Sequence, residues 1–183
     1  QQANYAWATA IQTQQDFESL LKKELCPNEA IATTFKEQQA IKRLDLPKIA
    51  IMGHGYNLYD PYLSMNLIKK VRERGFNVVT PEMAPPKIIE SRSKELRKRV
   101  FWTLGKRIMG SLLYYIDENI KGIIYIASFG CGPDSMVGHI AECYTRQRVL
   151  PFIMLTIDEH TGEAGINTRI EAFLDMLQRR SAV

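Results

Sequence analysis

The spacing of apolar residues divides the chain into a helical first part and a second part in which strands and helices alternate. Over residues 1–46, apolar positions recur at helical intervals and no strand pattern occurs. Pro27 predicts the start of a second helix, and Pro47 limits its end, because a residue before proline avoids the α conformation. The apolar faces of the two predicted helices contain Phe17, Leu20, Leu21 and Leu25, and then Ile31, Phe35 and Ile41. We therefore predict an N-terminal helical segment over residues 1–46.

Four short apolar runs after this segment predict strands, and a helical pattern follows each of them. The runs cover residues 48–52, 76–79, 122–128 and 152–158. The third run is almost continuously apolar, which is typical of a strand buried on both faces of a parallel sheet. Alternating strands and helices favour right-handed crossovers and a parallel sheet covered by helices. We predict an α/β domain over residues 47–183, with a three-layer, flavodoxin-like (Rossmann-like) parallel sheet of four strands in the order 2-1-3-4.

Local signals set the expected bounds of the helices in this domain. Asp60 followed by proline predicts a helix start, and Gly75 lies just after the expected end of that helix. A long helix is expected from about residue 93 to residue 118, and Pro133 opens the next one. The capping-box sequence at residues 168–171 predicts the start of the last helix.

Composition narrows the class of protein without naming a function. The chain has 183 residues, 45% of them hydrophobic, and a net charge of +4, which does not by itself imply a nucleic-acid partner. Its three cysteines exclude a disulfide scaffold and indicate a reducing compartment. No apolar run approaches the roughly 18 residues that would span a bilayer, and no signal peptide is recognisable. We expect a cytoplasmic protein with no nucleic-acid and no membrane partner.

The carboxyl ends of parallel strands form the usual ligand-binding edge of such a sheet, so the loops there are the first candidates for a site. After the first predicted strand, two glycines permit positive φ angles or close approach to a ligand. The plainer interpretation is a tight turn before a helix, and neither common nucleotide-binding motif is present. The candidate cofactor-binding residues of this loop are Gly53, His54, Gly55, Tyr56 and Asn57.

The loop after the third predicted strand places Cys131 between two glycines, just before a helix. The helix dipole and its free N–H groups favour a thiolate at this position. A thiolate serves either as a metal ligand or as a nucleophile, and the alternative is a small thiol that fills a turn. The candidate metal ligand is Cys131, and the candidate cofactor-binding residues around it are Gly130, Gly132, Asp134 and Ser135.

The loop after the fourth predicted strand contains Asp158, Glu159 and His160, which are candidates for acid–base catalysis or metal binding. The alternative is loop and cap chemistry ahead of the last helix. Of the remaining cysteines, Cys143 is expected in the core because it shares a helix face with apolar residues. Cys26 lies at the junction of the two predicted helices, and the pattern does not predict whether it is buried or near a site.

Three segments carry a resemblance to a known family. The sequences GHGYNLYDPYLSMNL, FGCGPDS and IDEHTGEAGINTRIEAFLDML lie between about residues 48 and 177. They resemble the C-terminal part of the 2-hydroxyacyl-CoA dehydratase D-component family, particularly its activase-related branch. The family usually has an arginine in the first loop, where this chain has His54.

The resemblance implies a domain of an oxygen-sensitive iron–sulfur protein of anaerobic metabolism. Such proteins hold a [4Fe–4S]-type or double-cubane cluster through cysteines and receive low-potential electrons from an ATP-dependent activase, separate or fused. They drive difficult reductions, including dehydration of a 2-hydroxyacyl-CoA, so an acyl-CoA is the implied substrate. Cys131 matches the cysteine of FGCGPDS and is implied as a cluster ligand.

One cysteine cannot hold a [4Fe–4S] cluster, and the family's other ligand motifs are missing from this chain. We therefore expect either a fragment that joins the remaining domains of a larger protein, or a relative that has lost the cluster. The isolated chain is expected to lack a cluster and to be inactive.

Two other classes of function stay open at this point. The first is a cysteine hydrolase or acyltransferase with Cys131 as nucleophile and His160 or His54 as base. It fits the strand–turn–helix placement, but Phe129 and Pro133 stand where a nucleophile elbow needs small residues. The second is a non-catalytic assembly domain within a multidomain protein.

Overall fold

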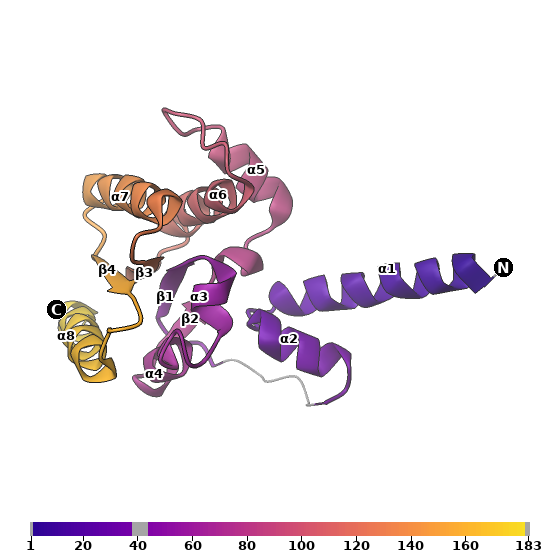
Figure 1. The fold of residues 1–183 in the computed structure, drawn as a ribbon, viewed down its shortest axis with the longest axis horizontal. Helices are drawn as coiled ribbons and strands as arrows, with labels where there is room; N and C mark the ends of the chain where they lie inside the picture. The colour runs from indigo at the N-terminus through magenta and orange to yellow at the C-terminus, as the bar shows by residue number, and fades with distance from the viewer. Residues whose placement is uncertain (1, 38–43, 182–183) are drawn as a thin grey trace.

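The computed structural model describes residues 2–37 and 44–181, and its centre is a parallel sheet (Figure 1). The four strands are β1 (Lys48–Gly53), β2 (Asn77–Val79), β3 (Gly122–Ser128) and β4 (Phe152–Ile157). All neighbouring pairs are parallel, and the strand order is β2-β1-β3-β4. The predicted α/β class and the order 2-1-3-4 are therefore confirmed.

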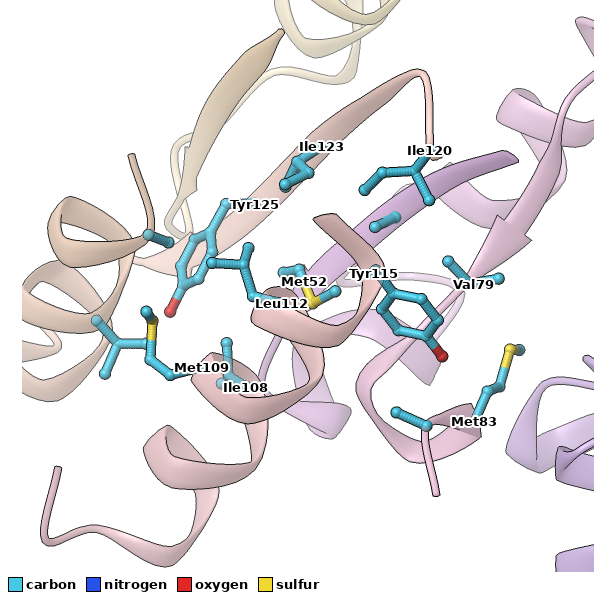
Figure 2. Packing of buried hydrophobic residues seen from close by; sticks show 14 of the residues in the cluster. Met52, Val79, Met83, Ile108, Met109, Leu112, Tyr115, Ile120, Ile123 and Tyr125 are labelled. Atoms are coloured by element: carbon cyan, nitrogen blue, oxygen red, sulfur yellow. The ribbon is translucent and has the colours of Figure 1, made fainter. Parts of the chain in front are cut away.

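Helices cover both faces of the sheet and give it three layers. On one face lie α6 (Thr103–Asp117) and α7 (Gly132–Gln147), and on the other lie α4 (Leu67–Glu73) and α8 (Glu163–Ser181) (Figure 1). Alternate residues of β3 point into the two hydrophobic clusters, so the strand is buried on both sides. Figure 2 shows Met109 and Leu112 of α6 packed against Ile123 and Tyr125 of β3.

The N-terminal part forms two helices, α1 (Gln2–Leu21) and α2 (Pro27–Thr34), and α1 projects away from the sheet (Figure 1). The expected apolar face of the second helix is not buried, because Ile31 and Phe35 are exposed. They line an open groove of about 700 Å³ between α1 and α2 instead of packing on the sheet. Ile41 of that predicted face lies outside the described residues.

The helix expected from Asp60 begins later than predicted. Oδ1 of Asp60 accepts hydrogen bonds from the backbone N–H groups of Tyr62 and Leu63, as an N-cap would. The chain then forms turns, Asn66 adopts a φ of 57°, and α4 starts only at Leu67. A short helix, α3 (Gly55–Tyr59), occupies the loop that was expected as a turn.

The helix predicted over residues 93–118 is shorter in the structure, because α6 covers only Thr103–Asp117 of that range. After the short 3₁₀ helix η1 (Pro81–Met83) comes α5 (Pro86–Ser93), and residues 94–102 separate it from α6. The two helices pack closely: a Cβ atom added at Gly110 would lie 2.4 Å from the carbonyl oxygen of Ile89. The chain must therefore reverse between them, although the helical spacing of apolar residues continues across the break.

The last helix also differs from its predicted start. α8 begins at Glu163, and Thr168 lies inside it, where its hydroxyl donates to the carbonyl of Ala164 at 3.0 Å. The capping-box sequence therefore does not cap the helix. Within residues 2–37 and 44–181, the structure has no helix with the length and apolar character that crossing a membrane requires.

Candidate functional site

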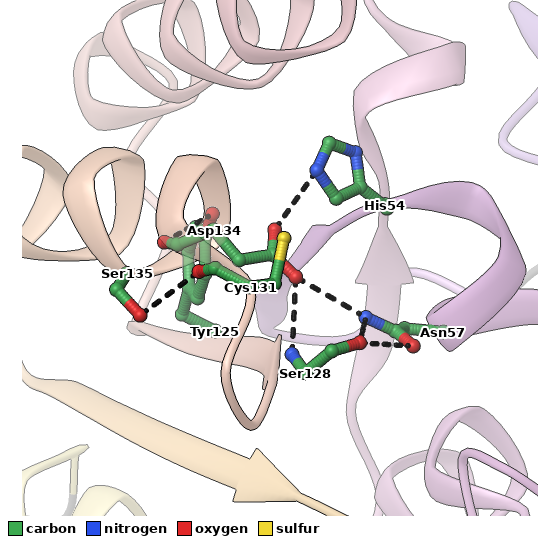
Figure 3. A network of polar contacts seen from close by, with 7 residues as sticks. All are labelled: His54, Asn57, Tyr125, Ser128, Cys131, Asp134 and Ser135. Atoms are coloured by element: carbon green, nitrogen blue, oxygen red, sulfur yellow. Dashed lines mark hydrogen bonds and ion pairs between the residues drawn. The ribbon is translucent and has the colours of Figure 1, made fainter.

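The carboxyl ends of β1 and β3 bring His54, Asn57, Cys131 and Asp134 together (Figure 3). These strands are parallel neighbours, with Gly53 paired to Ile126, so the loops that follow them emerge side by side. His54 precedes α3 and Cys131 precedes α7, each as the N-cap residue. Two of the three predicted loops thus form one site.

Gly53 and Gly130 make the two loops possible. Gly53 has a φ of +149°, and an added Cβ atom would lie 2.6 Å from the carbonyl oxygen of Ile126 in the neighbouring strand. Gly130 has a φ of +73°. Residues with a side chain rarely adopt these conformations, so glycine fixes where His54 and Cys131 leave their strands.

Asp134 lies at the centre of the site, and its side chain is fully buried. Its Oδ2 accepts hydrogen bonds from the backbone N–H of Ser128 at 3.0 Å and from Nδ2 of Asn57 at 3.5 Å. Nδ2 of Asn57 also donates to the Ser128 hydroxyl at 2.9 Å. These bonds tie the start of α7 to both strand ends (Figure 3).

The other carboxylate oxygen of Asp134 faces His54. Nε2 of His54 lies 3.0 Å from Oδ1 of Asp134, close enough for an ion pair when the imidazole is protonated. The two atoms are not aligned as a hydrogen bond, and no other described residue donates one to the buried Oδ1. Nδ1 of His54 is also buried and has no hydrogen-bond partner among the described residues. Leaving a buried polar atom without a hydrogen bond costs about 1–3 kcal/mol, so such atoms often mark a binding site.

Cys131 completes a group of three potential metal ligands. One ligand atom from each of His54, Cys131 and Asp134 lies within 4.8 Å of the other two. His54 and Asp134 are buried, whereas Cys131 is partly exposed at the edge of the sheet. Imidazole nitrogen, thiolate sulfur and carboxylate oxygen are the ligands that zinc and similar transition metals use in proteins.

Two tyrosines border the group. The ring of Tyr56 stacks on His54, with centroids 5.3 Å apart. Burial raises the pKa of Tyr56, and the nearby carboxylate of Asp134 raises it further. Tyr125 donates from its hydroxyl to the backbone carbonyl of Asp134 at 3.4 Å, and burial raises its pKa strongly. Both phenols are therefore neutral at physiological pH.

The remaining predicted residues take other places. Ser135 donates from its hydroxyl to the carbonyl of Cys131 at 3.0 Å, within the first turn of α7. The loop after β4 bonds to itself: Oδ1 of Asp158 accepts from the N–H of His160 and from the hydroxyl of Thr161, and these bonds lower the pKa of Asp158. Glu159 lies 3.8 Å from His160 and is as exposed as its partner.

No hydrogen bond or ion pair between described residues joins this third loop to Cys131. The sheet order does not explain this, because β4 is the parallel neighbour of β3; the polar groups of the third loop bond within the loop instead. Sequence reasoning missed Ser128, the last residue of β3, which holds both Asp134 and Asn57. Its position at the carboxyl end of a strand is the signal that would have identified it.

The other two cysteines lie away from the site. Cys143 is exposed rather than in the core as predicted, and its Sγ lies 3.8 Å from Nε2 of His139. Twelve residues of helix separate it from Cys131, which corresponds to roughly 18 Å. Cys26 is buried between α1 and α2, and Arg72 donates to its Sγ at 3.1 Å.

The donor set at this site does not fit a [4Fe–4S] cluster held by this chain alone. Such a cluster needs three or four ligands that are mostly cysteines, and only one of the chain's three cysteines lies here. One nitrogen, one sulfur and one oxygen donor fit a single metal ion instead.

The comparison with known families concerns the first half of the chain. Residues 1–84 match a family described as a CoA enzyme activase uncharacterised domain. The match includes α1, α2 and β1 to β2, and therefore His54 and Asn57, but it ends before Cys131 and Asp134. A search of curated proteins gives no match. Residues 1–84 are thus similar to this activase-associated domain.

Proposed function

We propose that this chain is a domain of an iron–sulfur redox protein related to the 2-hydroxyacyl-CoA dehydratases. In this proposal, Cys131 contributes one ligand to a cluster whose other ligands are cysteines outside the chain. The observation that carries the proposal is the single, partly exposed thiol at the carboxyl edge of the sheet. The relation of residues 1–84 to CoA enzyme activases supports the same context.

Exposed apolar side chains next to Cys131 support a site that another part of the protein covers. Tyr56 is 53% exposed, Phe129 is 72% exposed and Met136 is 55% exposed. Tyr56 stacks on His54, Phe129 is two residues before Cys131, and Met136 is in the second turn of α7. Aromatic residues and methionine are enriched where proteins meet. A cluster shared across such an interface accounts for the single thiol.

The role of this chain's residues is to hold and orient that thiol. Asp134 fixes the loop through Ser128 and Asn57, and Cys131 is the N-cap residue of α7. When bound, a cluster of this type supplies low-potential electron transfer. An ATP-dependent activase and an acyl-CoA are the partner and the substrate that the proposal implies, in a reducing, cytoplasmic compartment.

The test uses the longest natural protein that contains this chain, purified without oxygen. Iron, acid-labile sulfide and the visible absorption spectrum are measured for the wild type, for Cys131→Ala and for Cys143→Ala. We expect Cys131→Ala to lose iron and sulfide, and the exposed-cysteine control Cys143→Ala to keep both. Unchanged iron and sulfide in Cys131→Ala would contradict the proposal.

A cysteine hydrolase or acyltransferase is the second candidate, because a ring nitrogen of His54 lies within 4.8 Å of Sγ of Cys131. His160 is not a suitable base, since its side chain is 87% exposed and its contacts are within its own loop. An acyl-thioester substrate analogue should then acylate Cys131, and His54→Gln should slow the reaction. Equal rates for the wild type and His54→Gln would refute this candidate.

A further inference from the structure

We propose that His54, Cys131 and Asp134 bind a single divalent transition-metal ion, with zinc as the best match, in this chain by itself. The ligand atoms are Nε2 of His54, Sγ of Cys131 and Oδ1 of Asp134 (Figure 3). The site shares Cys131 with the proposed function but needs no cysteine from outside the chain. The ion and the cluster are alternative occupants of the same thiol, so this inference applies to the chain without the cluster and can hold when the cluster proposal fails.

The spacing of the three donors fits one ion. Zinc lies about 2.0–2.3 Å from nitrogen, oxygen and sulfur ligands, which places tetrahedral donors roughly 3.3–3.7 Å apart. Nε2 of His54 and Oδ1 of Asp134 are already 3.0 Å apart, and all three donors are within 4.8 Å of one another. Side-chain adjustments of about 1 Å would bring the donors to these distances. The relative position of the two loops is set by the pairing of the strands before them.

The hydrogen bonding of Asp134 leaves one oxygen for a metal. Oδ2 is held by Ser128 and Asn57, whereas Oδ1 is buried and accepts no hydrogen bond from any described residue. A carboxylate that ligates through one oxygen while the other is hydrogen-bonded is the common arrangement in metal sites. A bound cation would give Oδ1 the partner that the described part of the chain does not supply.

The charges and the ligand types select the class of ion. A divalent ion bound by one thiolate, one carboxylate and a neutral imidazole forms an uncharged centre, which suits a buried position. Magnesium and calcium prefer oxygen ligands alone, whereas thiolate and imidazole favour zinc and its neighbours among the transition metals. Three protein ligands leave a fourth position open, and the partial exposure of Cys131 places that opening at the surface.

The experiment titrates the metal-free, reduced chain with Co²⁺ as the probe and then displaces it with Zn²⁺. Cobalt bound by a thiolate in a four-coordinate site gives a near-ultraviolet charge-transfer band and intense visible bands. We expect one ion per chain, with loss of the charge-transfer band in Cys131→Ala and at least tenfold weaker binding in His54→Gln. Circular dichroism on each variant separates loss of binding from loss of folding.

The chain offers its own matched control, because Cys143 and His139 form a second cysteine–histidine pair on the surface of α7. We expect Cys143→Ala to leave the cobalt spectrum unchanged. Absence of the band in the wild type, or its loss in Cys143→Ala but not in Cys131→Ala, would overturn the proposal. No iron or sulfide is added, so this result is independent of the cluster measurement on the larger protein.

Discussion

Replacement of Gly53 by alanine should strongly destabilise the fold, because this residue fixes the exit of the chain from β1. Its φ of +149° is unfavourable for any residue with a side chain, and the new Cβ atom would lie 2.6 Å from the carbonyl oxygen of Ile126. Leu58, whose Cδ1 would be 2.8 Å away, can move, but the Ile126 carbonyl is part of the β3 backbone. Backbone strain of about 1–3 kcal/mol and overpacking of about 1–3 kcal/mol combine to about 2–6 kcal/mol.

The assay is urea unfolding followed by far-ultraviolet circular dichroism, with the midpoint and slope compared between variants. Gly55→Ala is the matched control two residues later: its φ is not positive, and its nearest contact, with the ring of Tyr59, would be 3.5 Å. We expect Gly55→Ala to change the free energy of unfolding by less than about 0.5 kcal/mol. Equal effects of the two substitutions would refute the reasoning.

Two further predictions concern the cysteines and the packing of α5 on α6. In the native chain, iodoacetamide should label Cys131 and Cys143, whereas Cys26 should react only in denaturant; native labelling of Cys26, read by peptide mass spectrometry, would contradict its burial. Gly110→Ala should lower the free energy of unfolding by about 1–2 kcal/mol, because the 2.4 Å clash with the Ile89 carbonyl outweighs a helix-propensity gain of about 1 kcal/mol. A stabilised Gly110→Ala variant in urea unfolding would show that the two helices do not pack this closely.

The sheet was predictable because its signals are local and repeated. Each strand is an apolar run bounded by polar residues or proline, and their alternation with helices leaves few possible topologies. The rule that ligands bind at the carboxyl ends of parallel strands located His54 and Cys131, since both lie in loops that follow the neighbouring strands β1 and β3. The inward position of Asp134 depends on Ser128 at the end of β3 and on Asn57, which belongs to a distant segment of the chain.

The errors have physical causes in long-range packing. The sequence pattern places Cys143 in the core, but the buried face of α7 passes through Val137, Ala141 and Thr145, so Cys143 is exposed. Apolar spacing alone does not determine which face of a helix is buried to within one residue. Apolar spacing also fails to predict the break before α6, because the helical pattern of apolar residues continues through it.

The central claim is that His54, Cys131 and Asp134 face one metal ion, and X-ray absorption at the zinc edge tests it most directly. The sample is the chain loaded with one equivalent of Zn²⁺. The account predicts one sulfur ligand at about 2.3 Å and the remaining ligands, nitrogen or oxygen, at about 2.0–2.1 Å. Cys131→Ala should remove the sulfur shell, and Cys143→Ala should leave it intact. A wild-type spectrum with no sulfur ligand, or with two or more, would contradict the account.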